Sequence, residues 1–102
     1  MTGDAPDAVA RQRRRRSAGA LELDFFVTAY FESKVLVKRP YLTREMCIRV
    51  VQRPVRVEPQ GDGDRVRFWA EVPELDGRVL RVVTLADQRT IHNAFPDRRF
   101  RP

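Results

Sequence analysis

The chain has 102 residues and a mass of 11.9 kDa, which fits a single domain. Hydrophobic residues make up 42% of it and charged residues 33%, with a formal net charge of +6. No uncharged stretch approaches the roughly 20 residues of a membrane span, so we do not expect a transmembrane protein. Because Cys47 and His92 are the only cysteine and histidine, we expect neither a disulfide framework nor a structural zinc site.

The N-terminal segment, residues 1–22, is predicted to be a disordered Arg-rich tail before one domain over residues 23–102. The tail contains the arginine run 13–16 and few large apolar residues that could dock it. This run either lies on phosphate groups or is simply solvated. A secretory signal is not expected, because Glu22 and Asp24 interrupt the apolar segment that follows the run. We therefore expect a cytoplasmic protein.

The first predicted element of the domain is a strand over residues 25–37, which is rich in aromatic and β-branched residues. A short helix is the alternative, because the periodicity of this segment does not distinguish a strand from a helix. A helix is predicted over residues 44–52, with Thr43 as its N-cap and Pro54 as its stop signal. Its apolar stripe consists of Met46, Cys47, Val50 and Val51, which assigns Cys47 to the core.

After Pro54 the apolar period changes from that of a helix to that of a strand. Turn signals at residues 60–64, Asp76-Gly77 and Asp87-Gln88 separate the segments that follow. The predicted strands cover residues 55–58, 65–72, 79–85 and 90–95. The chain is therefore predicted to be an α+β domain, with one principal helix packed on an antiparallel meander sheet of about four to five strands.

The hairpin between the last two predicted strands decides which side chains share a face of the sheet. Pairing Leu85 with Thr90 also pairs Val83 with His92. Arg81 and His92 then become diagonal neighbours on one face. The predicted core consists of Val66, Phe68, Val82, Ile91 and Phe95 from the strands and Met46 and Val50 from the helix.

Arg81 and His92 are the residues most suggestive of chemistry. Arg81 interrupts an otherwise apolar strand and either contacts a phosphate group or pairs with a carboxylate such as Glu71 or Asp97. His92 ordinarily titrates near neutral pH, and it is either a general acid or base or a packed or solvated histidine. Together they would suit the cleavage of RNA without a metal or other cofactor.

Further basic and aromatic residues are candidates for binding a nucleic acid. Arg98 is the third member of the predicted catalytic set, where it would hold the flanking backbone. Trp69 either stacks on a base or covers one end of the core, and Glu71 is either a base or a solvated side chain. The candidate nucleic-acid-binding residues are Arg67, Arg99, Lys38 and Arg39.

Several segments of the chain resemble small bacterial proteins of the RelE/ParE-like toxin fold, over about residues 27–100. A basic-Arg-Pro pattern, a helix and an Arg-Pro stop follow one another over residues 35–54. The other similar segments are Arg67-Phe68-Trp69, Leu80-Arg81-Val82-Val83 and Ile91-His92-Asn93-Ala94-Phe95-Pro96-Asp97-Arg98. The order of strand, helix and meander is also that of this fold.

The resemblance implies a toxin that cleaves messenger RNA, as RelE-like members do, or binds gyrase, as ParE-like members do. It also implies an antitoxin protein as partner. Arg81 and Arg98 would correspond to the basic residues that the ribonucleases of this group use. We therefore expect a metal-independent endoribonuclease of the toxin-antitoxin type, and the alternative is a non-catalytic module of the same fold that binds nucleic acid or protein.

Overall fold

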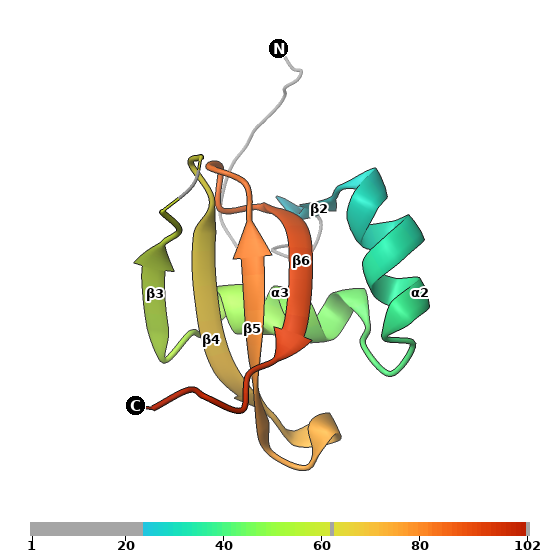
Figure 1. Cartoon of the computed structure of the whole chain (residues 1–102), viewed down its shortest axis with the longest axis vertical. Helices are drawn as coiled ribbons and strands as arrows, with labels where there is room; N and C mark the ends of the chain where they lie inside the picture. Colours follow the sequence, from blue (N-terminus) through green and yellow to red (C-terminus); the bar gives the residue numbers. More distant parts are fainter. Residues whose placement is uncertain (1–23, 62, 102) are drawn as a thin grey trace.

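The computed structural model of the protein describes residues 24–61 and 63–101. These residues form a five-stranded sheet in the order β2-β6-β5-β4-β3 (Figure 1). β2 runs parallel to β6, and all other neighbouring strands are antiparallel. The strands are β2 (Phe26–Val27), β3 (Arg56–Pro59), β4 (Val66–Val72), β5 (Arg78–Thr84) and β6 (Thr90–Pro96).

Two short helices accompany the sheet. One is continuous over residues 29–38 and contains a π-helical segment (Phe31–Val35) followed by α2 (Leu36–Lys38), and the other is α3 (Arg44–Gln52). A short 3₁₀ turn (Pro73–Leu75) joins β4 to β5. The predicted α+β class is confirmed, but the sheet is mixed and there is a second helix besides the predicted one. The predicted tail over residues 1–22 lies outside the described residues.

The helix over residues 29–38 stands where a strand was predicted. The hydroxyl oxygen of Thr28 accepts a hydrogen bond from the backbone N–H of Phe31 at 3.0 Å, as an N-cap residue does. Phe31 and Val35 lie about one turn apart and are both buried. The strand prediction is therefore wrong beyond Val27, because the cap and the apolar spacing outweigh the strand propensity of the individual residues.

Helix α3 forms over the predicted residues 44–52. The hydroxyl of Thr43 accepts a hydrogen bond from the backbone N–H of Met46 at 3.1 Å, which confirms the predicted N-cap. Cys47 is fully buried, as predicted. Burial, with the charge of Glu45 nearby, raises the pKa of its thiol to about 12. The thiol is therefore protonated at neutral pH and acts as a core group.

The two faces of the sheet differ in what covers them. The face toward α3 carries the apolar core. The opposite face is the outer face, and no helix lies over it in the described part of the chain (Figure 1). Its side chains are Arg56, Glu58, Arg67, Trp69, Glu71, Val79, Arg81, Val83, Asn93 and Phe95.

A β-bulge in β6 decides which of its side chains reach the outer face. Thr84 pairs with Ile91, but Val83 pairs with Asn93, so His92 is an extra residue in the strand. The predicted pairing of Val83 with His92 is therefore wrong. Residues of β6 beyond the bulge lie on the face opposite to the predicted one. Phe95 consequently lies on the outer face.

Most of the predicted core is confirmed. The buried residues among those predicted are Met46, Val50, Phe68, Val82 and Ile91. Val66 is only partly buried, and Phe95 is excluded from the core by the bulge. Within residues 24–61 and 63–101, no helix is long and apolar enough to cross a membrane. The same residues contain no group of three or more His, Cys, Asp or Glu side chains that could hold a metal ion.

Candidate nucleic-acid interface

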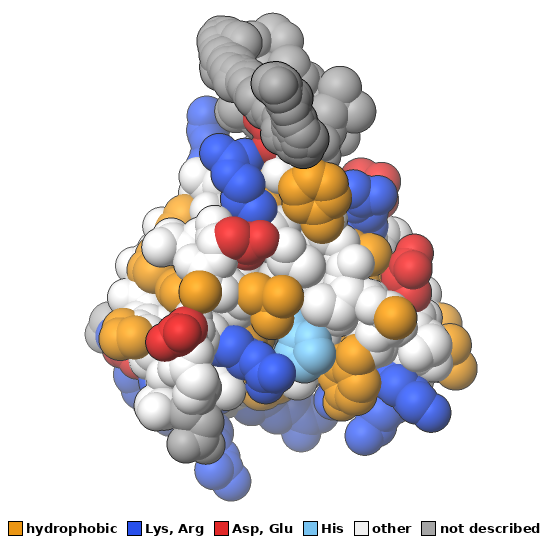
Figure 2. All heavy atoms as spheres, turned by 90° about the horizontal axis from the view of Figure 1, so that it is seen from above, with side chains coloured by type: hydrophobic (Ala, Val, Ile, Leu, Met, Phe, Trp, Pro, Cys, Tyr) orange, Lys and Arg blue, Asp and Glu red, His pale blue; other side chains and the backbone are white. Residues whose placement is uncertain are grey.

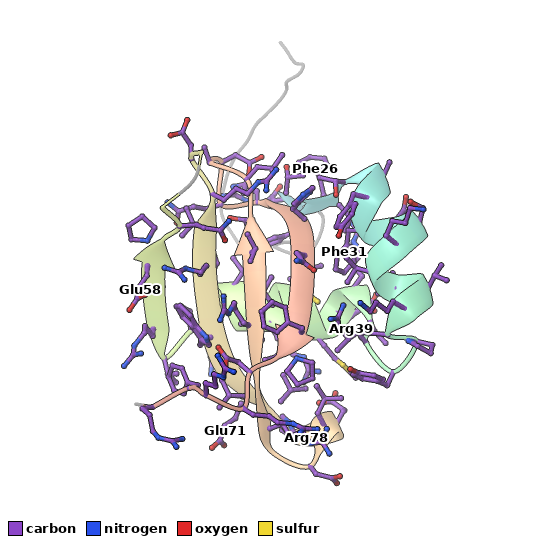
Figure 3. All side chains as sticks on the ribbon, viewed as in Figure 1. Phe26, Phe31, Arg39, Glu58, Glu71 and Arg78 are labelled. Atoms are coloured by element: carbon purple, nitrogen blue, oxygen red, sulfur yellow. The ribbon has the colours of Figure 1, made fainter. Side chains whose placement is uncertain are left out.

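A row of alternating arginine and aromatic side chains crosses the outer face from strand to strand. Its members in β3, β4, β5 and β6 are Arg56, Trp69, Arg81 and Phe95, each directly opposite the next. Arg39, which follows α2, extends the row beyond β6 (Figure 3), with its guanidinium carbon 5.8 Å from the centre of the Phe95 ring. These five residues are the arginine–aromatic row.

Positive charge lies close to both aromatic rings of the row. The guanidinium carbon of Arg81 is 4.7 Å from the centre of the Phe95 ring and 5.5 Å from that of Trp69. Arg67 approaches the other side of the row, 5.6 Å from the Trp69 ring. Distances below about 6 Å are those of attractive cation–π contacts. The row therefore combines charge with flat apolar surface.

Arg81 is paired with Asp97, which follows β6. Its Nε and Nη2 atoms donate to Oδ2 of Asp97 at 3.3 and 3.1 Å, and the indole N–H of Trp69 donates to the same oxygen at 2.9 Å. Partial burial by itself would raise the pKa of Asp97. The hydrogen bonds from Trp69, the backbone of Arg99 and Arg81 outweigh this effect and lower the pKa. Of the two alternatives for Arg81, the ion pair is thus the contact observed.

The C-terminal segment, residues 97–101, lies over the lower end of the outer face (Figure 1). The Phe100 ring is tilted against that of Trp69, with 5.9 Å between the ring centres. The guanidinium of Arg56 lies 4.8 Å from the centre of the Phe100 ring, and its Nη2 donates to the carbonyl oxygen of Arg101 at 2.7 Å. With this segment in place, Trp69 is only 4% exposed.

His92 lies at the bulge, against the start of the helix over residues 29–38. Its ring stacks on that of Tyr30 with 4.9 Å between the centres, and its Nδ1 is hydrogen-bonded to the Thr28 hydroxyl at 3.1 Å. Partial burial, together with the charge of Arg65, lowers the pKa of His92. Figure 2 shows the histidine reaching the surface between hydrophobic and basic side chains. His92 is therefore oriented, accessible and mainly neutral at neutral pH.

The structure does not bring the three predicted catalytic residues together. The residue opposite Arg81 is Phe95, and His92 lies further along β6 at the bulge. Arg98 lies beyond β6, where it lines a shallow hollow with Arg78 of the β4–β5 hairpin. These three side chains are spread over the surface and do not form one compact catalytic centre.

The predicted nucleic-acid-binding residues lie around the row. Arg39 belongs to it. Lys38, which precedes Arg39 at the end of α2, and Arg99, in the C-terminal segment, are both exposed. Arg67 lies 3.6 Å from Glu58 and donates from Nη2 to the carbonyl oxygen of Pro59 at 3.2 Å. Its Nε atom is buried and has no acceptor among the described residues.

Several residues of this surface were missed by sequence reasoning. Phe95 was assigned to the core, and Arg56 and Phe100 were not singled out. Only Thr28 had a signal of its own, because a threonine three residues before a buried apolar residue is an N-cap pattern. The others depend on the register beyond the bulge and on the path of the C-terminal segment.

Comparison with models of protein families, with curated proteins and with solved structures found no match for this chain. The RelE/ParE-like assignment therefore stays a prediction.

Proposed function

We propose that this protein binds single-stranded RNA on its outer face. The observation that carries the proposal is the arginine–aromatic row, in which Arg81 lies between the rings of Trp69 and Phe95. Proteins that bind single strands combine cationic side chains along the backbone with rings on which bases stack. A row of this composition across four strands supports such a role.

Arg39 is the member of the row best suited to bind a phosphate group. Among residues 24–61 and 63–101, no carboxylate lies within ion-pairing distance of Arg39, whereas Arg81 and Arg56 each have one. Its guanidinium lies on the Phe95 ring, beside the open part of the outer face. A phosphate at Arg39 would leave the neighbouring base within reach of that ring.

Binding of a fluorescent oligouridylate of about ten nucleotides, followed by anisotropy, tests the proposal. Arg39→Ala should weaken binding roughly tenfold and lower the slope of log K against log salt by about one. Arg53→Ala is the matched control, because Arg53 is an exposed arginine at the end of α3, away from the row. Equal losses in the two variants, or no binding by the parent protein, would refute the proposal.

A second candidate function is cleavage of the bound RNA by His92. The supporting observation is a histidine that Thr28 orients and Tyr30 stacks against, and partial burial lowers its pKa. His92 would accept the proton of a 2′-hydroxyl while the 2′-oxygen attacks the adjacent phosphorus. The 5′-oxygen would leave with a proton from water, and a 2′,3′-cyclic phosphate would remain. No metal enters this step.

This second candidate has its own test. The parent protein should produce fragments with 2′,3′-cyclic phosphate ends and should arrest bacterial growth when expressed, as the resemblance to toxins implies. His92→Ala should abolish both effects and preserve RNA binding. If the parent yields no fragments under conditions in which it binds RNA, cleavage is refuted and the binding function stands. The prediction of an antitoxin partner, which depends on a toxic ribonuclease activity, would then be refuted as well.

A further inference from the structure

The C-terminal segment occupies a part of the outer face that the arginine–aromatic row would otherwise leave open. We propose that residues 97–101 mimic one nucleotide, and that single-stranded RNA displaces the Asp97 side chain and residues 98–101 to reach Trp69 and Arg81. This inference rests on the proposed RNA-binding function and adds to it a nucleotide site that the protein's own chain fills.

Asp97 takes the place of a phosphate group. One of its carboxylate oxygens accepts hydrogen bonds from Nε and Nη2 of Arg81 and from the indole N–H of Trp69. Phosphate oxygens accept the same charge-assisted hydrogen bonds from a guanidinium group. The donors at this position therefore suit a phosphate as well as they suit a carboxylate.

Phe100 takes the place of a base. Its ring contacts both the Trp69 ring, with 5.9 Å between the ring centres, and the Arg56 guanidinium, at 4.8 Å. A nucleic-acid base is also flat, stacks on tryptophan and attracts a cation to its face. The two contacts of Phe100 are thus contacts that a base would make in the same place.

The segment is held to the sheet by few groups. The backbone N–H groups of Arg99 and Phe100 bond to Asp97, inside the segment itself. Among the described residues, residues 98–101 make one hydrogen bond to the sheet, from Arg56 to the carbonyl oxygen of Arg101. The backbone N–H of Asp97 also donates to the carbonyl oxygen of Val79 at 2.8 Å, so the backbone of Asp97 stays attached to β5. The Asp97 carboxylate and Phe100 supply most of the remaining attachment, and a ligand that replaces both would free residues 98–101.

The charge next to Arg81 is the same before and after the exchange, because a phosphodiester and the Asp97 carboxylate each carry one negative charge. Displacement would free Arg81 from the negative charge of Asp97 and give it a phosphate instead. Arg98, Arg99 and Arg101, all exposed, would remain attached next to the bound strand. Their charges attract the RNA backbone whether the segment is docked or displaced.

The experiment uses Trp69, the only tryptophan of the chain, as its reporter. The full chain and its Phe100→Ala variant are titrated with oligouridylate of about ten nucleotides while tryptophan emission is followed. Phe100→Ala should bind roughly tenfold tighter and show quenching of Trp69 at correspondingly lower RNA concentrations. Phe26→Ala, which alters an exposed phenylalanine on β2, is the matched control and should bind as the parent does.

A second measurement on the parent protein does not depend on the stability of a variant. In ¹H–¹⁵N spectra with saturating RNA, the backbone signals of residues 98–101 should move to disordered positions, and the indole N–H signal of Trp69 should shift. RNA binding that leaves these signals in place would overturn the displacement and preserve the proposed function. If neither the parent nor Phe100→Ala binds RNA, both the displacement and the proposed RNA-binding function are overturned. Tighter binding of single-stranded DNA than of RNA would retain the mimicry and overturn the choice of RNA.

Discussion

Arg81 lies directly opposite Phe95 in the β5–β6 ladder, and its guanidinium group covers the Phe95 ring at 4.7 Å. The contact exists because the bulge at His92 turns Phe95 away from the core. One extra residue in β6 therefore places an aromatic ring between Arg81 and Arg39. The bulge therefore determines the part of the arginine–aromatic row that lies in β6, whereas the regular β3–β4 and β4–β5 ladders place Arg56, Trp69 and Arg81.

Two phenylalanine substitutions test the placement of Phe95. Phe31→Ala should lower the free energy of unfolding by about 3–5 kcal/mol, because Phe31 is 0% exposed and no side chain can fill its space without strain. Phe95→Ala should cost only about 1 kcal/mol, from a cation–π contact and partial burial. Urea denaturation measures both values. Equal losses would mean that Phe95 is a core residue and that the bulge is absent.

The hydrogen bonds on Asp97 predict a pH dependence of stability. Since they lower the pKa of Asp97 in the folded protein, the stabilisation is fully present above about pH 4 and is lost as the pH falls through the lowered value. Asp97→Asn should cost about 1–3 kcal/mol at pH 7. The difference from the parent should shrink in more acidic solution.

Thermal melts between pH 2 and pH 7 would follow this difference. Glu71→Gln is the control, because Glu71 is exposed on the same face and has no ion pair among the described residues. A constant difference between Asp97→Asn and the parent at every pH would contradict the role given to the carboxylate.

His92 should titrate below its ordinary range, because partial burial and the charge of Arg65 both disfavour the protonated ring. Arg65→Ala should raise the pKa of His92, and Arg65→Lys should leave it nearly unchanged. Titration of the single histidine by ¹H NMR measures the pKa in each variant. If Arg65→Ala lowers the pKa, a different neighbour controls His92.

The Thr28 hydroxyl makes two hydrogen bonds, to the backbone N–H of Phe31 and to Nδ1 of His92. Two variants distinguish the loss of this hydroxyl from a change in side-chain shape. Thr28→Val removes the hydroxyl that caps the helix over residues 29–38 and that binds His92. It should cost about 1 kcal/mol of stability. Thr28→Ser retains the hydroxyl and should keep most of that stability. Chemical denaturation compares them, and equal losses for Val and Ser would show that the hydroxyl contributes nothing.

Local patterns in the sequence were sufficient for α3 and for most of the strands. Thr43 and the apolar stripe define α3 by contacts within a few residues, and the turn signals delimit β4, β5 and β6 in the same way. Residues 25–37 were predicted as a strand, because they are rich in aromatic and β-branched residues. The cap at Thr28 favours a helix instead. The parallel pairing of β2 with β6 joins segments far apart in the chain and has no local signal.

The sequence by itself determined the α+β class, the helix α3, its buried Cys47 and most of the core, since these follow from propensity, capping and periodicity along the chain. Only the tertiary structure decided which side chains share the outer face. A single bulge reverses the orientation of every later residue in a strand, and the sequence gives it no distinct mark. The pairing of Arg81 with Asp97 and the position of Phe100 on Trp69 likewise depend on the folded path of the C-terminal segment, which brings groups from β4, β5 and residues 97–101 together.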